Sequence, residues 1–443
     1  MLKNFFKTAG RNILKYRAYS IINFVGLTSG LALALLILTY VRSEVSYDQF
    51  HENADRLYRV KYVAPNGLEL ASSPPPIAPL MKDFFPEVEE AGRMYGRNVS
   101  ITVPGKEQSF EETDIYFADS TLMGMFTFEF IHGNPERALV DKFTVIIDEG
   151  MAAKYFGDKN PIGESLIFGG GNSFKVTGVV KDFPENSHLR FNMLVPYENM
   201  YDMESTQAAQ VLRNNLAINF IISHSHTYVL LKPGADPSRV DSSMESFLKK
   251  YARPDLLVGQ VFTLMPLTDI HLTSTLLVEP TATNSWTNIY IFIGVGILTL
   301  VIACINYVNL STAQSFSRIK EIGIRKVLGS FRYQLIGQFM AESFLFCLVA
   351  MILSYGAFYL ALPLLNELTG KTLQFDQVVD SGMLLASLAL VVLITVMAGA
   401  YPSYFVTQFN SIQSLKGDGA AQYGNQFLRR MLVVFQLTIA CML

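Results

Sequence analysis

Hydrophobic residues in this chain gather into long runs that polar segments separate. Four runs contain no Asp, Glu, Lys or Arg, at residues 21–41, 289–310, 343–365 and 383–405. A helix of about 20 residues rises ~30 Å, the thickness of a bilayer's hydrocarbon core. The pattern therefore predicts four transmembrane helices, over residues 21–42, 287–310, 335–365 and 383–406.

The first run could instead belong to a cleavable signal peptide. A signal peptide has an apolar core of about 7–15 residues and ends in a small-x-small cleavage site. This run is longer and ends in Tyr40-Val41-Arg42. We therefore expect a retained membrane anchor.

The 244 residues between the first two runs, residues 43–286, have a different texture. Stretches rich in β-branched residues predict strands at residues 143–147, 173–180 and 227–231. Helical patterns cover residues 150–156 and 237–251, and residues 169–172 are typical of a hairpin connection. The fold class predicted is an α+β integral membrane protein, with a large mixed α/β domain inserted between the first and second transmembrane helices.

The distribution of charged residues predicts which side of the membrane each segment occupies. Half of the residues are hydrophobic and 16% are charged, with a mean hydropathy of +0.27, too apolar for a typical soluble chain. Lys and Arg outnumber acids in residues 1–20, 311–334 and 407–430, whereas residues 366–382 hold one base and three acids. Because basic loops stay cytoplasmic, the N-terminus is expected inside and residues 43–286 outside. Residues 1–20 also fit an amphipathic basic helix at the membrane surface, although a merely basic flank is the alternative.

The loop between the second and third runs is the most informative segment. Arg318, Lys320, Arg325, Lys326 and Arg332 stand against one acid, Glu321, which by charge alone is an ordinary cytoplasmic loop. The full pattern, S-R-I-K-E-I-G-I-R-K-V-L-G-S, resembles the coupling segment of MacB/FtsX-type ABC transporter permeases, which meets the ATPase. The resemblance assigns that contact to Arg318, Glu321, Ile322, Gly323, Ile324, Arg325, Lys326, Leu328 and Gly329.

Other stretches carry the same resemblance over nearly the whole chain. Residues 145–168 resemble a run of the MacB periplasmic core domain, and residues 46–60 and 176–191 look like its Bacteroidota-type relatives. Residues 399–403 and 415–417 match the exit of the FtsX-like membrane module. The resemblance implies a permease subunit of the bacterial inner membrane that couples ATP hydrolysis by a separate ATPase to export or mechanotransmission on the periplasmic side. It also implies a second FtsX-like half or a homodimer, contact with membrane lipid and, in some assemblies, a periplasmic adaptor.

Catalytic motifs give no competing assignment. The sequence holds no G-x-x-x-x-G-K-[ST], H-E-x-x-H, C-x-x-C or G-x-S-x-G, so no cofactor is expected on this chain and ATP is expected on the partner. His224 and His226 are spaced to share a strand face, but without further ligands a metal site is the weaker interpretation. Cys304, Cys347 and Cys441 all fall in apolar segments, so disulfides are not expected in residues 43–286. The N-terminal basic residues lead into a span, so nucleic acid is not an expected partner.

The sequence argues against two other functions. A membrane-anchored signalling receptor would need a cytoplasmic output module, yet no predicted cytoplasmic segment exceeds about 25 residues. Proton-driven transport would need ionisable groups within the spans, and the nearest is Glu342 at an edge. Residues 431–443 resemble the start of a fifth transmembrane helix, which suggests the first half of a tandem permease; a short interfacial tail is the alternative.

Overall fold

The structure is a computed structural model that forms two units. The unit Ser43–Trp286 is called the outer domain here, and Met1–Arg42 with Thr287–Leu443 is called the helical module. The residues described are 17–105, 108–169, 171–253, 259–317, 324, 328–407, 431 and 433–438. Each unit is described by itself.

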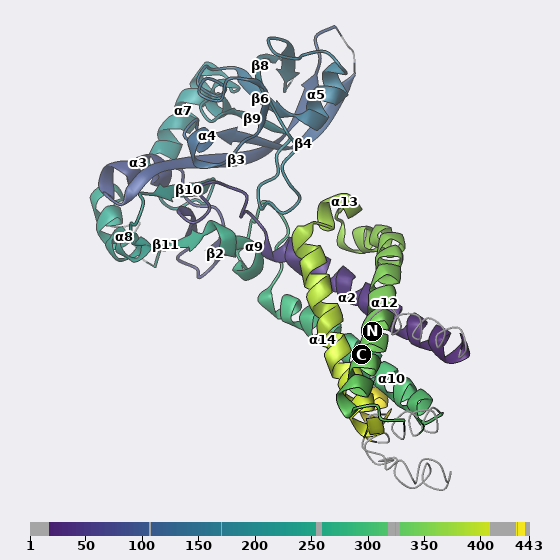
Figure 1. The fold of residues 1–443 in the computed structure, drawn as a ribbon. Coiled ribbons are helices and arrows are strands. Elements are labelled where there is room, and N and C mark those ends of the chain that lie inside the picture. The colour runs from purple at the N-terminus through teal and green to yellow at the C-terminus, as the bar shows by residue number, and fades with distance from the viewer. Residues whose placement is uncertain are drawn as a thin grey trace. The chain divides into compact units, whose positions relative to one another are not determined.

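The outer domain is built on one mixed sheet of 11 strands (Figure 1). The order along its path is β11-β1-β10-β3-β4-β9-β6-β8-β5, with β2 paired to β1 and β7 paired to β3 and β8. The strands are β1 (Leu57–Val63), β2 (Glu69–Leu70), β3 (Val88–Thr102), β4 (Ser109–Ala118), β5 (Phe130–Gly133), β6 (Thr144–Asp148), β7 (Ser165–Phe168), β8 (Asn172–Val180), β9 (Met193–Pro196), β10 (His226–Leu231) and β11 (Val261–Pro266).

The two faces of the central strands enter separate apolar cores. In β4, Ile115 and Phe117 belong to one core, whereas Tyr116 and Ala118 belong to the other. This alternation follows from the period of two in a strand, which sends successive side chains to opposite faces. The central strands are therefore buried on both sides, which explains their nearly continuous runs of apolar residues.

Helices cover both parts of the sheet. The helices α3 (Ile77–Phe84) and α8 (Pro237–Tyr251) share a core with β1 and β10, and α5 (Glu149–Phe156) and α7 (Thr206–Ala217) share one with β4, β6 and β9. Short helices complete the domain: α4 (Leu122–Met125), α6 (Asn199–Asp202), the 3₁₀ turn η2 (Leu267–Asp269) and α9 (Ile270–Thr273).

The elements predicted for this domain are confirmed with shifts of at most one residue. The predicted strands correspond to β6, β8 and β10, and the predicted helices to α5 and α8. Asp148 caps α5 by accepting the Met151 N–H, and Gly157 ends it with φ of 62°. The hairpin at residues 169–172 is also confirmed, because β7 and β8 are antiparallel with Phe168 opposite Asn172.

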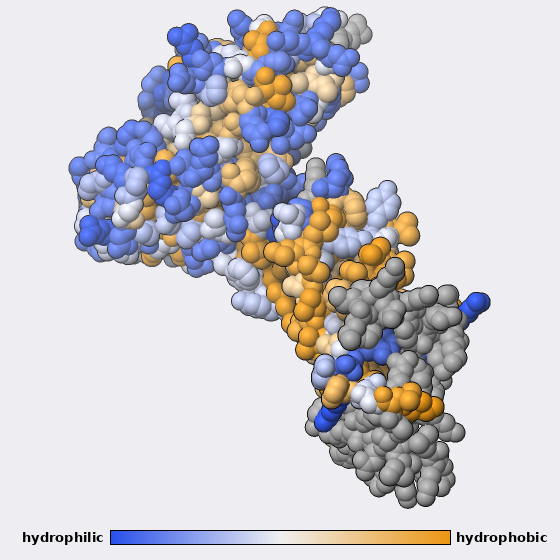
Figure 2. Space-filling model, in the orientation of Figure 1, coloured by the Kyte–Doolittle hydropathy of each residue, from blue (hydrophilic) through white to orange (hydrophobic). Residues whose placement is uncertain are grey.

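The helical module includes the helices α2 (Arg17–Val45), α10 (Trp286–Ser317), α12 (Arg332–Thr369), α13 (Phe375–Val378) and α14 (Ser381–Thr407). Figure 2 shows hydrophobic residues gathered over this unit, while the face of the outer domain in view is largely hydrophilic. By length and composition α2, α10 and α12 can each cross a membrane, and α14 holds a shorter apolar stretch, Ser381–Met397. The count of four transmembrane helices stays a prediction.

Small residues and aromatic rings let these helices pack closely. A Cβ on Gly30 of α2 would lie 2.7 Å from Cβ of Ala303 on α10, so this close approach requires glycine. Phe24 of α2 stacks on Phe346 of α12 with ring centroids 3.8 Å apart. Tyr307 of α10 donates to Oγ of Ser343 on α12 at 3.1 Å, so its hydroxyl is satisfied in an apolar setting.

Candidate functional site

The coupling segment predicted from the sequence connects α10, which ends at Ser317, to α12, which begins at Arg332. Of its predicted residues, Arg318, Glu321, Ile322, Gly323, Arg325 and Lys326 lie outside the described residues. Ile324 is helical, and the N–H of Leu328 donates to its carbonyl at 3.0 Å, one helical turn apart. Gly329 then adopts φ of 92°, a conformation that favours glycine at a helix end.

The described part of this segment presents apolar side chains to its surroundings. Ile324 is 50% exposed and Leu328 80% exposed, and their spacing of four places them on one helical face. Phe331 and Tyr333, at the start of α12, are also exposed, and their rings stack with centroids 5.7 Å apart. Ile324 and Leu328 are predicted from the sequence, whereas the two aromatic residues carry no signal in the family pattern. Exposed aromatic side chains are typical of protein contact sites.

A second candidate site lies in the outer domain, where its first and last residues meet. Glu44, near the end of α2, is 4% exposed and accepts hydrogen bonds from Nε2 of His271 at 2.8 Å and Nδ2 of Asn284 at 2.6 Å. The Tyr47 ring stacks on the His271 ring, with centroids 3.3 Å apart. One buried carboxylate thus joins the entry from α2 to the segment that leads into α10.

The next turn of the entry segment binds a distant loop. Asp48 is fully buried, and its Oδ1 accepts from Oγ of Ser187 at 3.1 Å and from the backbone N–H of His188 at 3.0 Å. Nδ1 of His188 lies 3.0 Å from the same oxygen, and its Nε2 is 2.9 Å from the Tyr228 hydroxyl on β10. Hydrogen bonds therefore join two stretches that carry the family resemblance, residues 46–60 and 176–191.

Charge balance in this pocket favours an ionised carboxylate. Burial alone would raise the pKa of Asp48, but the nearby His188, its N–H and His51 outweigh burial and lower that pKa below its ordinary value. The N–H of Thr127 donates to Nδ1 of His51 at 3.1 Å, which places the proton of the neutral ring on Nε2, toward Asp48. A ring whose second nitrogen already accepts a hydrogen bond is a poor metal ligand in its neutral form.

A buried ion pair fixes the segment before α10 onto the sheet. The Arg59 side chain on β1 is fully buried, and its Nη1 and Nη2 donate to the two carboxylate oxygens of Glu279 at 2.5 and 2.7 Å. Glu279 also accepts from the Ser274 hydroxyl. Such a bidentate ion pair is strong because both partners are charged, and its two parallel hydrogen bonds fix the orientation of the guanidinium. We call Glu44, Asp48, Arg59, His188, His271, Glu279 and Asn284 the root cluster.

The two histidines considered as metal ligands have different surroundings. The His224 ring stacks on the Tyr95 ring, and Nδ1 of His224 lies 2.8 Å from Oγ of Ser225. His226 is buried and its Nδ1 lies 3.2 Å from the Ala71 carbonyl. Across the residues that the structure describes, no group of three His, Cys, Asp or Glu side chains is placed to hold a metal ion.

Comparison with known proteins matches both units. The model of the MacB-like periplasmic core domain matches residues 20–247, and that of the FtsX-like permease C-terminal region matches residues 269–411. Two macrolide export ATP-binding/permease proteins MacB are similar, from Bdellovibrio bacteriovorus (25% identical over 345 residues) and Agrobacterium fabrum (24% over 277 residues). These matches cover 76% and 62% of this chain but 47% and 38% of the relatives, so the chain spans about half of their length or less.

A solved structure is similar to part of the chain. It is a domain of a protein described as a permease, from Porphyromonas gingivalis, with a TM-score of 0.41 and 25% identity, covering 49% of this chain and 92% of that one. The first family model alone spans half of the sequence. With a MacB-like periplasmic core domain and an FtsX-like permease region, the chain belongs to the MacB/FtsX family of ABC transporter permeases.

Proposed function

We propose that this chain is the membrane subunit of an ABC transporter and transmits motion from a separate cytoplasmic ATPase to its outer domain. The ATPase binds and hydrolyses ATP, and this chain binds no cofactor. Four helices, α2, α10, α12 and α14, cross the inner membrane with the N-terminus in the cytoplasm and the outer domain in the periplasm. The observation that carries the proposal is the exposed apolar pair Ile324 and Leu328 within a basic segment between two spans.

The ATPase contact is the segment from Arg318 to Gly329. Its charged residues Glu321, Arg325 and Lys326 set the orientation of the contact, and its apolar residues are buried by it. ATPases of this class work as dimers with two-fold symmetry, which requires two such segments. The second comes from another copy of this chain or from a second FtsX-like half.

The root cluster gives a physical route for the motion within the outer domain. Glu44 lies in the last turn of α2, and Asn284 lies two residues before α10 begins at Trp286. Glu44 accepts hydrogen bonds from both His271 and Asn284. A displacement of α2 or of α10 therefore strains the same buried contacts. The displacement reaches the sheet through two contacts, that of Arg59 on β1 with Glu279 and that of Tyr228 on β10 with His188. Motion of the outer domain then acts on a periplasmic substrate.

Charge reversal in the coupling segment tests the ATPase contact. Glu321→Lys or Arg325→Glu should lower stimulation of the partner ATPase several-fold, because an exposed interface charge contributes about 1 kcal/mol and reversal adds repulsion. Gly323→Leu should abolish stimulation, since glycine permits a close approach that a side chain blocks. ATP hydrolysis is measured with both proteins in vesicles, and Lys249→Glu on α8 is the matched control. Parental rates in all three variants would contradict the contact.

The orientation has its own test in intact spheroplasts. Cysteines placed singly at Ser173, Ser242 and Ser317 are expected to differ in their reaction with a membrane-impermeant thiol reagent. Ser173 and Ser242 lie on exposed positions of the outer domain and should be labelled from outside, whereas Ser317 should be labelled only after lysis. The background replaces Cys304, Cys347 and Cys441 with serine. Labelling at position 317 in intact spheroplasts would reverse the proposed topology.

A further inference from the structure

The segment that joins α9 to α10, residues 274–285, is called the exit segment here, and its backbone takes an unusual conformation at Val278. The φ of Val278 is 62°, in the left-handed region that glycine adopts readily. A β-branched residue is an outlier there, because its Cβ lies too close to the following carbonyl oxygen. The conformation therefore costs free energy, and the surrounding structure must hold it in place.

The side chain of Val278 provides little packing to offset this cost, because it is 62% exposed. Phe143 also has a positive φ, 58°, but it is half-buried and its ring lies with its centroid 5.5 Å from that of Phe174. The other non-glycine residues with positive φ in the described part of the chain are Asp48 and Asp114, and aspartate tolerates this region. At Val278, therefore, the local preference of the residue opposes the fold without a gain in packing.

Backbone hydrogen bonds to β2 and the residue after it hold the residue before Val278. The N–H of Leu277 donates to the Glu69 carbonyl, and the N–H of Ala71 donates to the Leu277 carbonyl, both at 2.9 Å. Leu277 thereby forms a short parallel bridge with Leu70. Ala71 is fully buried, so its amide hydrogen exchanges with solvent only when this bridge opens.

The buried ion pair holds the residue after Val278. Glu279 accepts from both terminal nitrogens of Arg59 on β1 and from the hydroxyl of Ser274, which lies in the same exit segment. Trp286, where α10 begins, follows eight residues after Val278. The strained turn is therefore fixed between two anchors, the bridge to β2 and the ion pair with β1, on the path from the sheet to α10.

We propose that residues 277–279 form a strained latch between the sheet and α10. In the closed state both anchors are made and Val278 is held in the left-handed region. In the open state both anchors are broken and Val278 takes the extended backbone that β-branched residues prefer. The strain lowers the ratio of closed to open molecules by a factor of about 5–30. Extending Val278 also lengthens the path from the sheet to α10, so α10 can move while the sheet keeps its structure.

The test is hydrogen exchange of the full chain in detergent, read by mass spectrometry at the amide of Ala71. In the parent protein this amide should exchange faster than the amides of β6, which lies between β8 and β9 in the sheet. Val278→Gly removes the strain, so exchange at Ala71 should become about 5–30-fold slower. Val278→Asn keeps a side chain that tolerates the left-handed region, so it should also slow this exchange.

Matched variants make this result specific. Val278→Ile keeps the β-branched side chain, so exchange at Ala71 should equal that of the parent. Val140→Gly changes another valine, 61% exposed, that is not among the residues with positive φ, and it should not slow exchange at Ala71. Glu279→Ala removes the second anchor and should speed this exchange at least tenfold.

Two outcomes would overturn the latch. If Ala71 and the amides of β6 exchange at the same rate in the parent, the bridge opens only when the whole sheet unfolds. Unchanged exchange at Ala71 in both Val278→Gly and Val278→Asn would show that no strain opposes the two anchors. No ATPase is present in this experiment, so the latch and the proposed ATPase contact fail independently.

Discussion

Glu279→Ala is expected to lower the free energy of unfolding of the outer domain by about 3–5 kcal/mol, because it leaves the fully buried Arg59 guanidinium without its counter-charge. The measurement is urea unfolding of the full chain in detergent, followed by far-UV circular dichroism and by the fluorescence of Trp286. Trp286 is the only tryptophan in the sequence and lies seven residues after Glu279.

Two control variants make this result specific. Glu245→Ala removes an ion pair with Lys249 on α8 whose side chains are 78% and 66% exposed, and it should cost less than about 1 kcal/mol. The double change Arg59→Met with Glu279→Leu should recover much of the loss, since apolar residues can replace a buried pair at little cost. A loss in Glu279→Ala no larger than that in Glu245→Ala would show that the exit segment is held by other contacts.

The same variant bears on the proposed function. Glu279 lies on the segment that leads from the sheet into α10, so freeing it should weaken the mechanical link between that helix and β1. Partner ATPase stimulation should survive, because the coupling segment is unchanged. The amplitude of the ATP-driven motion of the outer domain should decrease. A variant that keeps ATPase stimulation but loses motion of the outer domain identifies Glu279 as part of the path that transmits the motion, and not as part of the ATPase contact.

The outer domain should lose stability as the pH falls from about 6.5 toward 4. Burial lowers the pKa of His51, His224 and His226 from 6.5 to about 4 in each case. The unfolded chain therefore takes up these protons first, so the stability is fully present above pH 6.5 and declines below it. For His51 and His226, which are the most buried, the loss at pH 4 is on the order of 2–3 kcal/mol each.

Three carboxyls of the outer domain act in the opposite direction, because burial raises the pKa of Asp119, Asp148 and Asp241. Burial raises the pKa of Asp148 from 3.8 to about 6, so its protonation favours the folded state over part of the same range. The decline expected between pH 6.5 and 4 is the part carried by the three histidines, whose pKa values move across that whole range. Asp48, whose pKa is lowered, contributes stability that is fully present above its ordinary pKa of 3.8 and is lost only as the pH falls below that value.

Urea unfolding at several pH values checks this expectation. His226→Asn keeps an N–H donor for the Ala71 carbonyl and removes one titrating group, so it should flatten the slope between pH 6.5 and 4. His132→Asn, at an exposed side chain of β5, is the matched control. A slope that His226→Asn leaves unchanged would show that this histidine does not carry the pH dependence.

Local patterns in the sequence were sufficient for the units and several of their elements. The runs of uncharged residues located the apolar helices, because a bilayer-length helix needs only local composition. The strands β6, β8 and β10 and the helices α5 and α8 were predicted from β-branched runs and helical spacing, which are also local signals. The charges and glycines of residues 318–330 indicated the coupling segment in the same way, and its partner contact stays a prediction.

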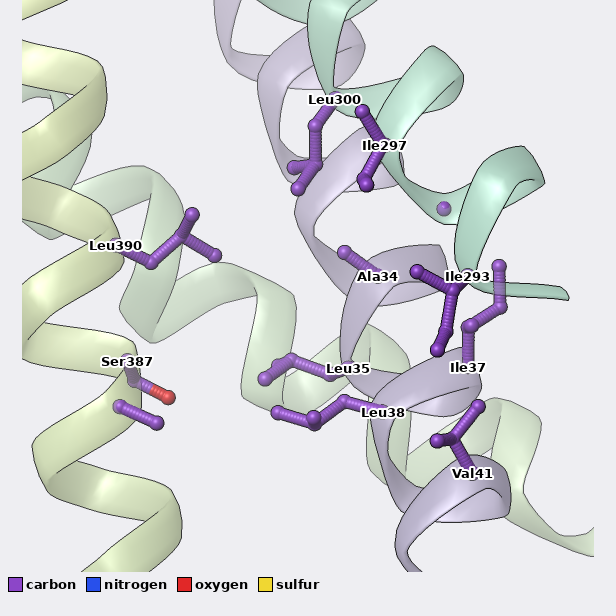
Figure 3. A pocket seen from close by; sticks show the side chains of 12 residues that line it. Ala34, Leu35, Ile37, Leu38, Val41, Ile293, Ile297, Leu300, Ser387 and Leu390 are labelled. Atoms are coloured by element: carbon purple, nitrogen blue, oxygen red, sulfur yellow. The ribbon is translucent and has the colours of Figure 1, made fainter. Parts of the chain in front are cut away.

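The tertiary structure alone decided the root cluster and the apolar pocket between α2, α10 and α14 (Figure 3). Glu44 and Asn284 are 240 residues apart, and Arg59 and Glu279 are 220 apart, so no local period connects them. The small residues Ala34, Gly296 and Ala386 look like ordinary helix positions until three helices bring them together. A sequence shows which side chains are apolar or charged, whereas only the fold determines which of them share a buried volume, and burial sets their energies.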